Sequence, residues 1–257
     1  MLDTAVAHAL IADTCRNLDE MEVISKRSFR LVVRRAAPDG TPVIVKLWAR
    51  PGWKGAARRV LGQTAARYEF RNLRMMERLG VPAPRAYGYG RAAPNAQGYT
   101  DAMVMEDLGE IELAGVYLKG RVQAGDEAAV QHFEDEVIRM TGILTRAHII
   151  DFDHSMVNIV VKDRDPIRLD LEKARRVPWN GLRPKLYGEM IGQLLATYVF
   201  AVQPDMGRAG RFAEKLFDEI TPAPGIVKLA QAHVDKQLKR QKDGKGIDMA
   251  LVLPSGL

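Results

Sequence analysis

Polar residues interrupt an otherwise apolar stretch at residues 148–161, HIIDFDHSMVNIVV. The run VNIVVK begins in this stretch and is followed by PIRLDL, and the DRDP at residues 163–166, which shares its proline with PIRLDL, is typical of a turn. The two runs therefore predict a β-hairpin with its turn centred near residues 164 and 165. Acids next to buried strands constrain the fold strongly, because a buried charge without a partner costs free energy.

Three oxygen-bearing side chains converge at one edge of this predicted hairpin. Asn158 stands at the start of the first strand and Asp170 at the end of the second, so antiparallel pairing places them nearly opposite. Asp153 lies in the loop that leads to the same edge. Each residue alone is more typical of turn chemistry. Together they favour a Mg²⁺ site, because Mg²⁺ takes few protein oxygen ligands and completes its shell with water and phosphate.

A lysine in the strand-like run at residues 43–48, VIVKLW, shares its face of the strand with apolar neighbours. Such a position would bury the positive charge of the lysine. Glu69 would bury a negative charge, since it falls in line with Leu73 and Met76 on one stripe of a predicted helix. An ion pair between Lys46 and Glu69 would solve both problems. The alternative is that Lys46 extends to solvent from an edge strand while Glu69 lies at the margin of its stripe.

The first part of the chain is rich in predicted strands. Residues 21–49 read as strands, with a hairpin whose turn contains Asp-Gly. Residues 54–80 predict one long helix that ends at Gly80. The segments RAYGYG and DAMVMED predict two further short strands. Residues 1–106 are therefore expected to form a β-rich lobe.

The second part, residues 107–257, is mostly helical by pattern. A helix is predicted over 126–148, where apolar residues recur at helical spacing, and further helical segments follow from about residue 183. We therefore expect an α+β fold of two lobes, the second of which carries the hairpin and its polar edge.

Charge and composition limit the partners. The formal net charge of +6 suits an anionic partner, such as a nucleotide, a phosphorylated glycan or an acidic membrane surface, or it simply aids solubility. No basic helix or aromatic-interleaved strand indicates nucleic-acid binding. The single cysteine excludes an internal disulfide and favours a reducing compartment. Without a signal-peptide pattern, and with no apolar run near the roughly 20 residues that span a bilayer, a cytoplasmic location is expected.

The order of these residues along the chain resembles the protein-kinase arrangement for phosphoryl transfer. That arrangement has a lysine on a strand, a glutamate on a helix, a D-x-x-x-x-N loop and an aspartate after a strand. The segments EFRNLRMMERLGVPAPRAYGYG and LDLEKARR resemble those of the bacterial lipopolysaccharide core kinases, the WaaP, Kdo-kinase and InaA group. The insert WARPGWKGAARRVLG also looks like theirs, and could bind glycan phosphates or acidic lipid headgroups. The resemblance covers roughly residues 25–200.

The resemblance implies a two-lobed protein-kinase-like fold and ATP- and Mg²⁺-dependent phosphorylation of a sugar hydroxyl, on heptose or Kdo, in the lipopolysaccharide inner core. It further implies peripheral association with the inner face of the inner membrane. Lys46 would hold the α- and β-phosphates and Glu69 would orient it. Backbone groups from Glu106 to Leu108 would meet the adenine ring.

For the chemical step, the resemblance implies that Asp153 accepts the proton of the attacking hydroxyl, while Asn158 and Asp170 hold Mg²⁺. Such residues are needed because phosphoryl transfer requires cations that spread the charge of the transition state and a well-aligned alcohol. His154, next to Asp153, is expected to serve loop packing rather than catalysis.

The sequence departs from protein kinases in several places. Residues 22–30, where a glycine-rich loop belongs, contain no glycine, so the side chains of Lys26, Arg27 and Ser28 would have to contact phosphate. Leu171 replaces the phenylalanine that follows the metal-binding aspartate in protein kinases. Two alternatives therefore stay open: a small-molecule or protein kinase of the same fold, and a pseudokinase that acts as a binding or regulatory module.

Overall fold

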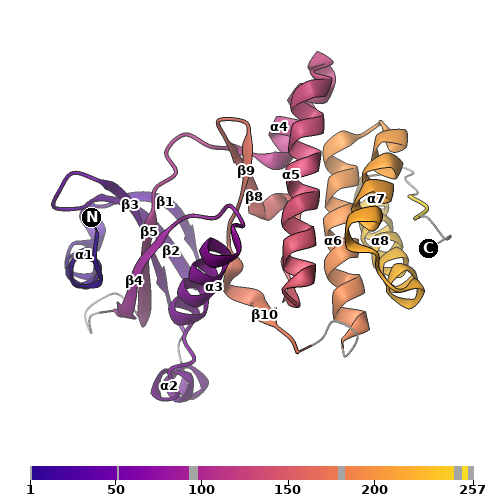
Figure 1. The fold of residues 1–257 in the computed structure, drawn as a ribbon. Coiled ribbons are helices and arrows are strands. Elements are labelled where there is room, and N and C mark those ends of the chain that lie inside the picture. Colours follow the sequence, from indigo (N-terminus) through magenta and orange to yellow (C-terminus); the bar gives the residue numbers. More distant parts are fainter. Residues whose placement is uncertain (1, 51, 93–97, 179–182, 246–250, 254–257) are drawn as a thin grey trace. The chain divides into compact units, whose positions relative to one another are not determined.

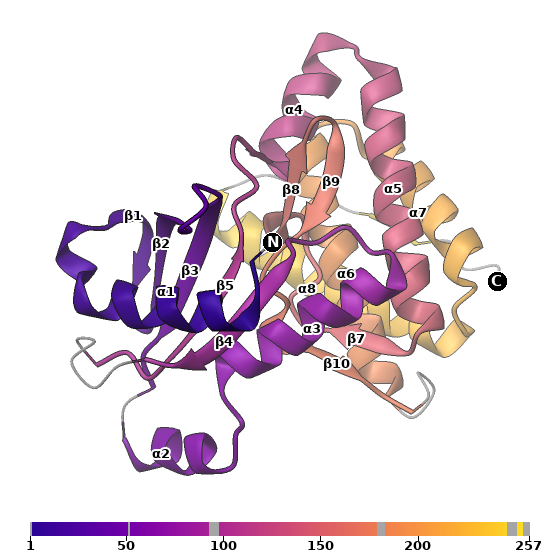
Figure 2. The ribbon, with the colours of Figure 1, turned by 60° about the vertical axis from the view of Figure 1, so that its left-hand side comes forward.

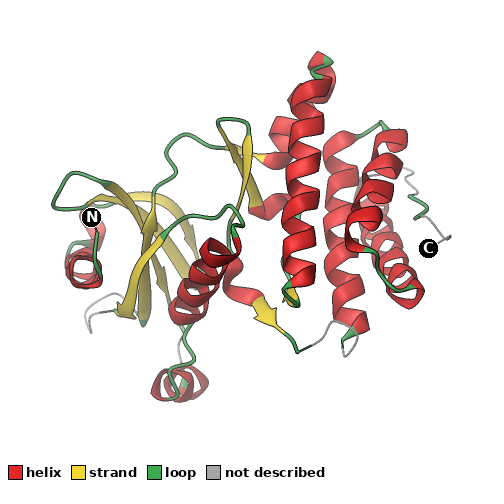
Figure 3. Cartoon of the chain, viewed as in Figure 1, coloured by secondary structure: helices red, strands yellow, loops and turns green. Residues whose placement is uncertain are grey.

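The computed structural model describes residues 2–50, 52–92, 98–178, 183–245 and 251–253. The chain folds into two compact units, Met1–Gly109 and Glu110–Leu257. Strands form the centre of the first unit and helices dominate the second (Figures 1 and 3). The α+β composition expected from the sequence is therefore present.

The first unit is built on an antiparallel sheet with strand order β1-β2-β3-β5-β4. Its strands are β1 (Glu22–Arg27), β2 (Arg30–Ala36), β3 (Pro42–Trp48), β4 (Ala86–Arg91) and β5 (Asp101–Glu106). On β3, Val43, Val45 and Leu47 join a core that also contains Ala7, Leu10 and Ile11 of α1 (Thr4–Arg16). Because side chains alternate along a strand, Lys46 belongs to the opposite face.

Where the sequence predicts one helix over residues 54–80, the structure has two, α2 (Trp53–Val60) and α3 (Ala65–Leu79). Gly62 adopts a positive φ of 64°, and Thr64 caps α3 by accepting a hydrogen bond from the Arg67 N–H at 3.3 Å. A left-handed glycine and an N-cap end one helix and begin the next. The sequence prediction also omits α1.

The second unit consists mainly of helices: α4 (Ala114–Ala124), α5 (Glu127–Arg146), α6 (Pro184–Val202), α7 (Met206–Ile220) and α8 (Pro224–Lys245). Helix α6 is largely buried and packs closely on α8. A Cβ on Gly192 of α6 would lie 2.7 Å from the Ala230 carbonyl oxygen, so glycine is required for this approach. None of the helices in the described ranges is long and apolar enough to cross a membrane.

The predicted hairpin is formed by β8 (Ile159–Lys162) and β9 (Asp165–Arg168), which join β6 (Glu112–Leu113) in a small sheet. Its turn is centred between Asp163 and Arg164, which have φ of 51° and 79°, so the predicted centre near 164 and 165 is one residue too late. Pro166, the first residue of the predicted second strand, lies in β9, opposite Val161. An edge strand tolerates proline because one of its sides forms no ladder.

Candidate active site

Lys46 is held on a central strand of the first unit. It lies opposite Val32 of β2 and opposite Met103 of β5, so β3 has paired neighbours on both sides. Only 5% of the residue is exposed. The alternative that Lys46 extends to solvent from an edge strand is therefore wrong.

Glu69 supplies the partner that this buried ammonium needs. It lies on the buried stripe of α3, 0% exposed, and its Oε1 is 2.7 Å from Lys46 Nζ. The predicted ion pair is confirmed. Asp101, at the start of β5, accepts a hydrogen bond from the Ala66 N–H at 3.0 Å, which fixes the first turn of α3 against the sheet. The ammonium and the carboxylate thus lie where neither is solvated by bulk water.

The residues expected to contact nucleotide lie in two other places on the first unit. Lys26 is exposed near the end of β1. Arg27 of β1 lies opposite Arg30 of β2, and Ser28 is the first residue of the turn between them. A two-residue turn therefore stands where a glycine-rich loop would. Side chains, rather than glycine backbone, are what this hairpin presents to solvent.

The segment from Glu106 to Leu108 follows from the end of β5 and is well anchored. The Glu106 N–H donates to the Arg85 carbonyl oxygen at 2.8 Å, and its carboxylate accepts from the Arg85 N–H at 3.0 Å. Asp107 forms an ion pair with Arg34 at 2.6 Å. Any adenine contact here would use backbone groups other than the Glu106 N–H.

Asp153 and Asn158 are joined in the loop between β7 (Ile149–Asp151) and β8. The Asn158 Nδ2 donates to the Asp153 carbonyl oxygen at 2.9 Å. Since only the nitrogen end of the amide can donate, this bond identifies Oδ1 as the end that could bind a cation. The Leu169 N–H donates to the Asn158 carbonyl oxygen at 2.8 Å, and Asp170 follows directly. Two hydrogen bonds and the peptide bond between Leu169 and Asp170 therefore link all three residues predicted at the hairpin edge.

Asp170 has an unusual backbone conformation. Its φ of 52° and ψ of 52° are left-handed, a region that residues other than glycine seldom occupy. It precedes the 3-10 turn η3 (Leu171–Lys173), and the residue is partly exposed. Uncommon backbone geometry of this kind is concentrated at functional sites, where neighbouring structure holds it in place.

The sequence did not predict Lys173, which pairs with the Asp153 carboxylate at 2.8 Å. The strand β10 (Ala174–Arg176) pairs with β7 so that Ala174 lies opposite Asp151, and this register brings Lys173 beside Asp153. The hydrogen bond from the Lys173 ammonium to the Asp153 carboxylate is the main cause that raises the pKa of Lys173. No spacing along the chain indicated this pair, because it depends on the register between β10 and β7.

A second residue that the sequence did not single out is Arg168, which forms an ion pair with Asp151. Both side chains are 0% exposed. The other carboxylate oxygen of Asp151 accepts a hydrogen bond from the Asp153 N–H at 3.1 Å. On β9, Pro166 and Arg168 are buried while Ile167 is only partly buried, so the apolar alternation of PIRLDL indicated the other face of the strand.

His154 packs in the core of the second unit, as expected. Its Nε2 lies 2.9 Å from the Thr141 hydroxyl, which donates its own proton to the Val137 carbonyl oxygen at 2.8 Å. The hydroxyl therefore accepts from His154, and Nε2 carries the proton. Burial, with a smaller effect from the Arg168 guanidinium, holds the pKa of His154 well below its usual value of 6.5.

The donor set fits a particular kind of metal. Among the described residues, no group of three or more His, Cys, Asp or Glu side chains is arranged to hold a metal ion. Asp153, Asn158 and Asp170 contribute two carboxylates and one amide, all partly exposed. Mg²⁺ binds through one or two carboxylates and leaves other positions to water and phosphate. The residues therefore fit Mg²⁺ rather than a metal that needs a complete protein cage.

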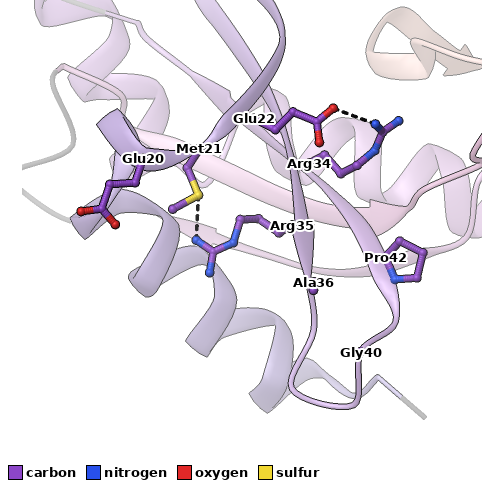
Figure 4. A pocket seen from close by; sticks show the side chains of 8 residues that line it. All are labelled: Glu20, Met21, Glu22, Arg34, Arg35, Ala36, Gly40 and Pro42. Atoms are coloured by element: carbon purple, nitrogen blue, oxygen red, sulfur yellow. Dashed lines mark hydrogen bonds and ion pairs between the residues drawn. The ribbon is translucent and has the colours of Figure 1, made fainter.

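A pocket of about 420 Å³ lies elsewhere on the first unit, and Figure 4 shows the side chains around it. It is lined by Glu20, Met21, Glu22, Arg34, Arg35, Ala36, Gly40 and Pro42. Both arginines are already engaged, Arg34 with Glu22 at 2.8 Å and Arg35 with Asp13 at 2.6 Å. None of the predicted site residues is among those that line it.

Comparisons with known proteins place the chain. The model of the lipopolysaccharide kinase (Kdo/WaaP) family matches residues 36–180. Among solved structures, "WaaP in complex with acyl carrier protein" is similar with a TM-score of 0.55 and 18% identity, over 90% of this chain and 92% of that one. No curated protein matches. The chain therefore belongs to the lipopolysaccharide kinase (Kdo/WaaP) family and is a phosphotransferase that acts on a sugar hydroxyl of the lipopolysaccharide core.

Proposed function

We propose that this kinase transfers the γ-phosphate of ATP, with Mg²⁺, to a heptose or Kdo hydroxyl of the inner core. The residues that would carry the reaction are Lys46, Glu69, Asp153, Asn158 and Asp170. The observation that carries the proposal is the buried pair of Lys46 and Glu69, 2.7 Å apart. Apolar residues of similar volume would stabilise the fold at least as well, so a charged pair here is best explained by a phosphate ligand.

In this proposal, Lys46 holds the α- and β-phosphates, and Glu69 fixes the ammonium in position. Glu69 acts through Lys46 and is a positioning residue. The pair is preorganised by the sheet and by the capped start of α3, so little reorganisation is needed when phosphate binds. Lys26 and Ser28 contact phosphate with their side chains, and the backbone from Glu106 to Leu108 meets adenine.

Asp153 orients the acceptor hydroxyl and takes its proton. The Lys173 ammonium, 2.8 Å from the carboxylate, limits the rotation of the Asp153 side chain. The Asp151 carboxylate holds the Asp153 N–H at 3.1 Å and so positions the backbone of the loop. Alignment of a weakly activated alcohol is the main requirement of phosphoryl transfer.

Asn158 and Asp170 would hold Mg²⁺ through Oδ1 and a carboxylate oxygen. When bound, Mg²⁺ supplies positive charge that the phosphate oxygens need during transfer. The left-handed backbone of Asp170 is consistent with a residue whose position is set by function rather than by local preference.

The acceptor is part of a glycolipid, so we place the enzyme in the cytoplasm with peripheral association at the inner face of the inner membrane. The formal net charge of +6 supports an anionic acceptor and an anionic surface.

The test is transfer of labelled γ-phosphate from Mg²⁺-ATP to purified lipopolysaccharide core by the full chain. We expect Asp153→Ala and Asp170→Ala to lower the rate by at least about 10²-fold. The control is Asp165→Ala, since Asp165 is exposed and pairs with His132 at 2.8 Å; this variant should keep full activity. ATP bound without any transfer would point instead to a pseudokinase, and no ATP binding would remove the basis of the proposal.

A further inference from the structure

Helix α2 presents its apolar side to solvent. Trp53, Val60 and the following Leu61 are 76%, 84% and 66% exposed. Positions 53, 57, 60 and 61 lie on one side of a helix, because they follow the i, i+4, i+7, i+8 spacing. Residue 57 is an exposed alanine. The four side chains therefore form one outward-facing apolar stripe, the reverse of an ordinary surface helix.

The opposite side of α2 contacts the segment that leads into the helix. A Cβ on Gly55 would lie 2.0 Å from the Arg50 carbonyl oxygen, so the helix backbone touches the chain at this point. The Arg59 guanidinium donates to the same oxygen at 3.3 Å. Gly55 and Arg59 are four residues apart and share one side of the helix. These two contacts turn this side of α2 toward Arg50, and Trp53 and Val60 lie on the other side of the helix.

Trp53, Val60 and Leu61 are largely exposed in the part of the first unit that the structure describes. Figures 1 and 2 show α2 beyond the end of the sheet, apart from α1 and α3. The exposed Arg58 flanks the stripe on the same helix. The result is a short amphipathic helix with a tryptophan on its apolar side and positive charge beside it.

We propose that α2 docks the kinase on an anionic phospholipid surface, with Trp53, Val60 and Leu61 entering the headgroup region and Arg58 meeting lipid phosphates. Tryptophan is favoured at the boundary between headgroups and acyl chains, and arginine complements anionic lipid. A protein partner is a weaker fit, because α2 has 8 residues and a stable interface buries about 800 Å² on each partner. The inference rests on the proposed function only in that the acceptor is a membrane glycolipid.

The experiment measures binding of the purified full chain to vesicles by sedimentation, with no ATP or acceptor present. Vesicles of phosphatidylethanolamine and phosphatidylglycerol are compared with vesicles of phosphatidylcholine alone. We expect binding to the anionic vesicles only, with about fivefold weaker partitioning in Arg58→Gln and at least about tenfold weaker partitioning in Trp53→Ser/Val60→Ser. Added salt should weaken binding by the wild type.

The matched control is Val252→Ser, which removes a valine that is 82% exposed in the second unit and should leave binding unchanged. Failure of the wild type to bind anionic vesicles would overturn the proposal and leave the stripe to a protein partner. The proposal would also be overturned if the Trp53→Ser/Val60→Ser variant bound anionic vesicles as strongly as the wild type.

A second readout does not depend on the fold of that double variant. Trp53 emission, obtained as the difference between wild type and Trp53→Phe, should shift to the blue on anionic vesicles and be quenched by brominated lipid. No shift would contradict the proposal. Transfer to a delipidated core oligosaccharide should be equal in wild type and Trp53→Ser/Val60→Ser, so loss of docking and loss of kinase chemistry are distinguished.

Discussion

Asp151 and Arg168 form an ion pair from which solvent is entirely excluded, with both side chains 0% exposed. The pair joins β7 to β9, and each residue stands two positions before a proposed active-site residue, Asp153 and Asp170 respectively. The Asp151 carboxylate also accepts the Asp153 N–H at 3.1 Å. One buried carboxylate therefore links the ends of the two strands that precede the two aspartates.

Replacing Arg168 by methionine should lower the free energy of unfolding by about 3–5 kcal/mol, because it leaves the Asp151 charge buried without its partner. Urea unfolding of the purified chain measures the change. The exposed pair of Arg139 and Glu136, 2.7 Å apart, offers a matched control, since Arg139→Met should cost less than about 1 kcal/mol.

The double variant Asp151→Asn/Arg168→Met should recover part of this loss. Asparagine removes the buried charge yet keeps an oxygen that can accept the Asp153 N–H. A double variant no more stable than Arg168→Met alone would show that packing, rather than the unpaired charge, causes the loss.

The Lys46–Glu69 pair allows stability and activity to be separated. Lys46→Met and Glu69→Leu should each destabilise the chain by about 3–5 kcal/mol, since each leaves one charge buried alone. The double variant Lys46→Met/Glu69→Leu should regain most of this stability, because two apolar side chains pack without a desolvated charge. Phosphate transfer should stay at least about 10²-fold lower in the double variant. Activity that returns with stability would show that the pair is only structural.

Lys173 should influence the rate of transfer more than the binding of nucleotide. Lys173→Met removes the ammonium that pairs with Asp153 at 2.8 Å, and we expect kcat to fall by about tenfold to 10²-fold as the carboxylate loses its orientation. The KM for ATP should change little, and Lys173→Arg should restore part of kcat. An equal loss in Lys173→Arg and Lys173→Met, or a rise in KM alone, would contradict a positioning role.

The sequence predicted the elements whose periodicity is strong and local. The alternation around Lys46 and the helical stripe through Glu69 gave the correct faces, because one side of each element is buried against its neighbours. The break at Gly62 was missed, since apolar spacing alone does not show where a glycine turns left-handed. α1 was missed although Asp3 caps it by accepting from the Val6 N–H at 2.9 Å.

Within the candidate site, the unpredicted residues are those that depend on register. Lys173 reaches Asp153 only because β10 pairs with β7, and no spacing along the chain encodes that pairing. Arg168 is buried because its partner Asp151 is buried too, so neither could be placed without the other. Long-range pairing of this kind is fixed by tertiary structure rather than by local pattern.

His154 should make the chain sensitive to acid. Burial, then the Arg168 guanidinium, lowers the pKa of His154 well below 6.5, so the folded state keeps the ring neutral while the unfolded chain takes up a proton. The unfolded state then binds more protons below pH 6.5, and stability falls with decreasing pH by up to about 1.4 kcal/mol per pH unit until the folded-state pKa is reached.

The free energy of unfolding is measured for wild type and His154→Gln from pH 8 downward. This starting pH lies about 1.5 units above the ordinary histidine pKa, so the ring is neutral in both states at the start. Glutamine keeps an N–H for the Thr141 hydroxyl, which His154 contacts at 2.9 Å, but it cannot be protonated. We expect parallel curves above pH 6.5 and a steeper loss in the wild type below it. If the two curves stay parallel throughout, His154 is not the group that senses acid. A steeper loss in His154→Gln would reverse the sign of the linkage and contradict burial as its cause.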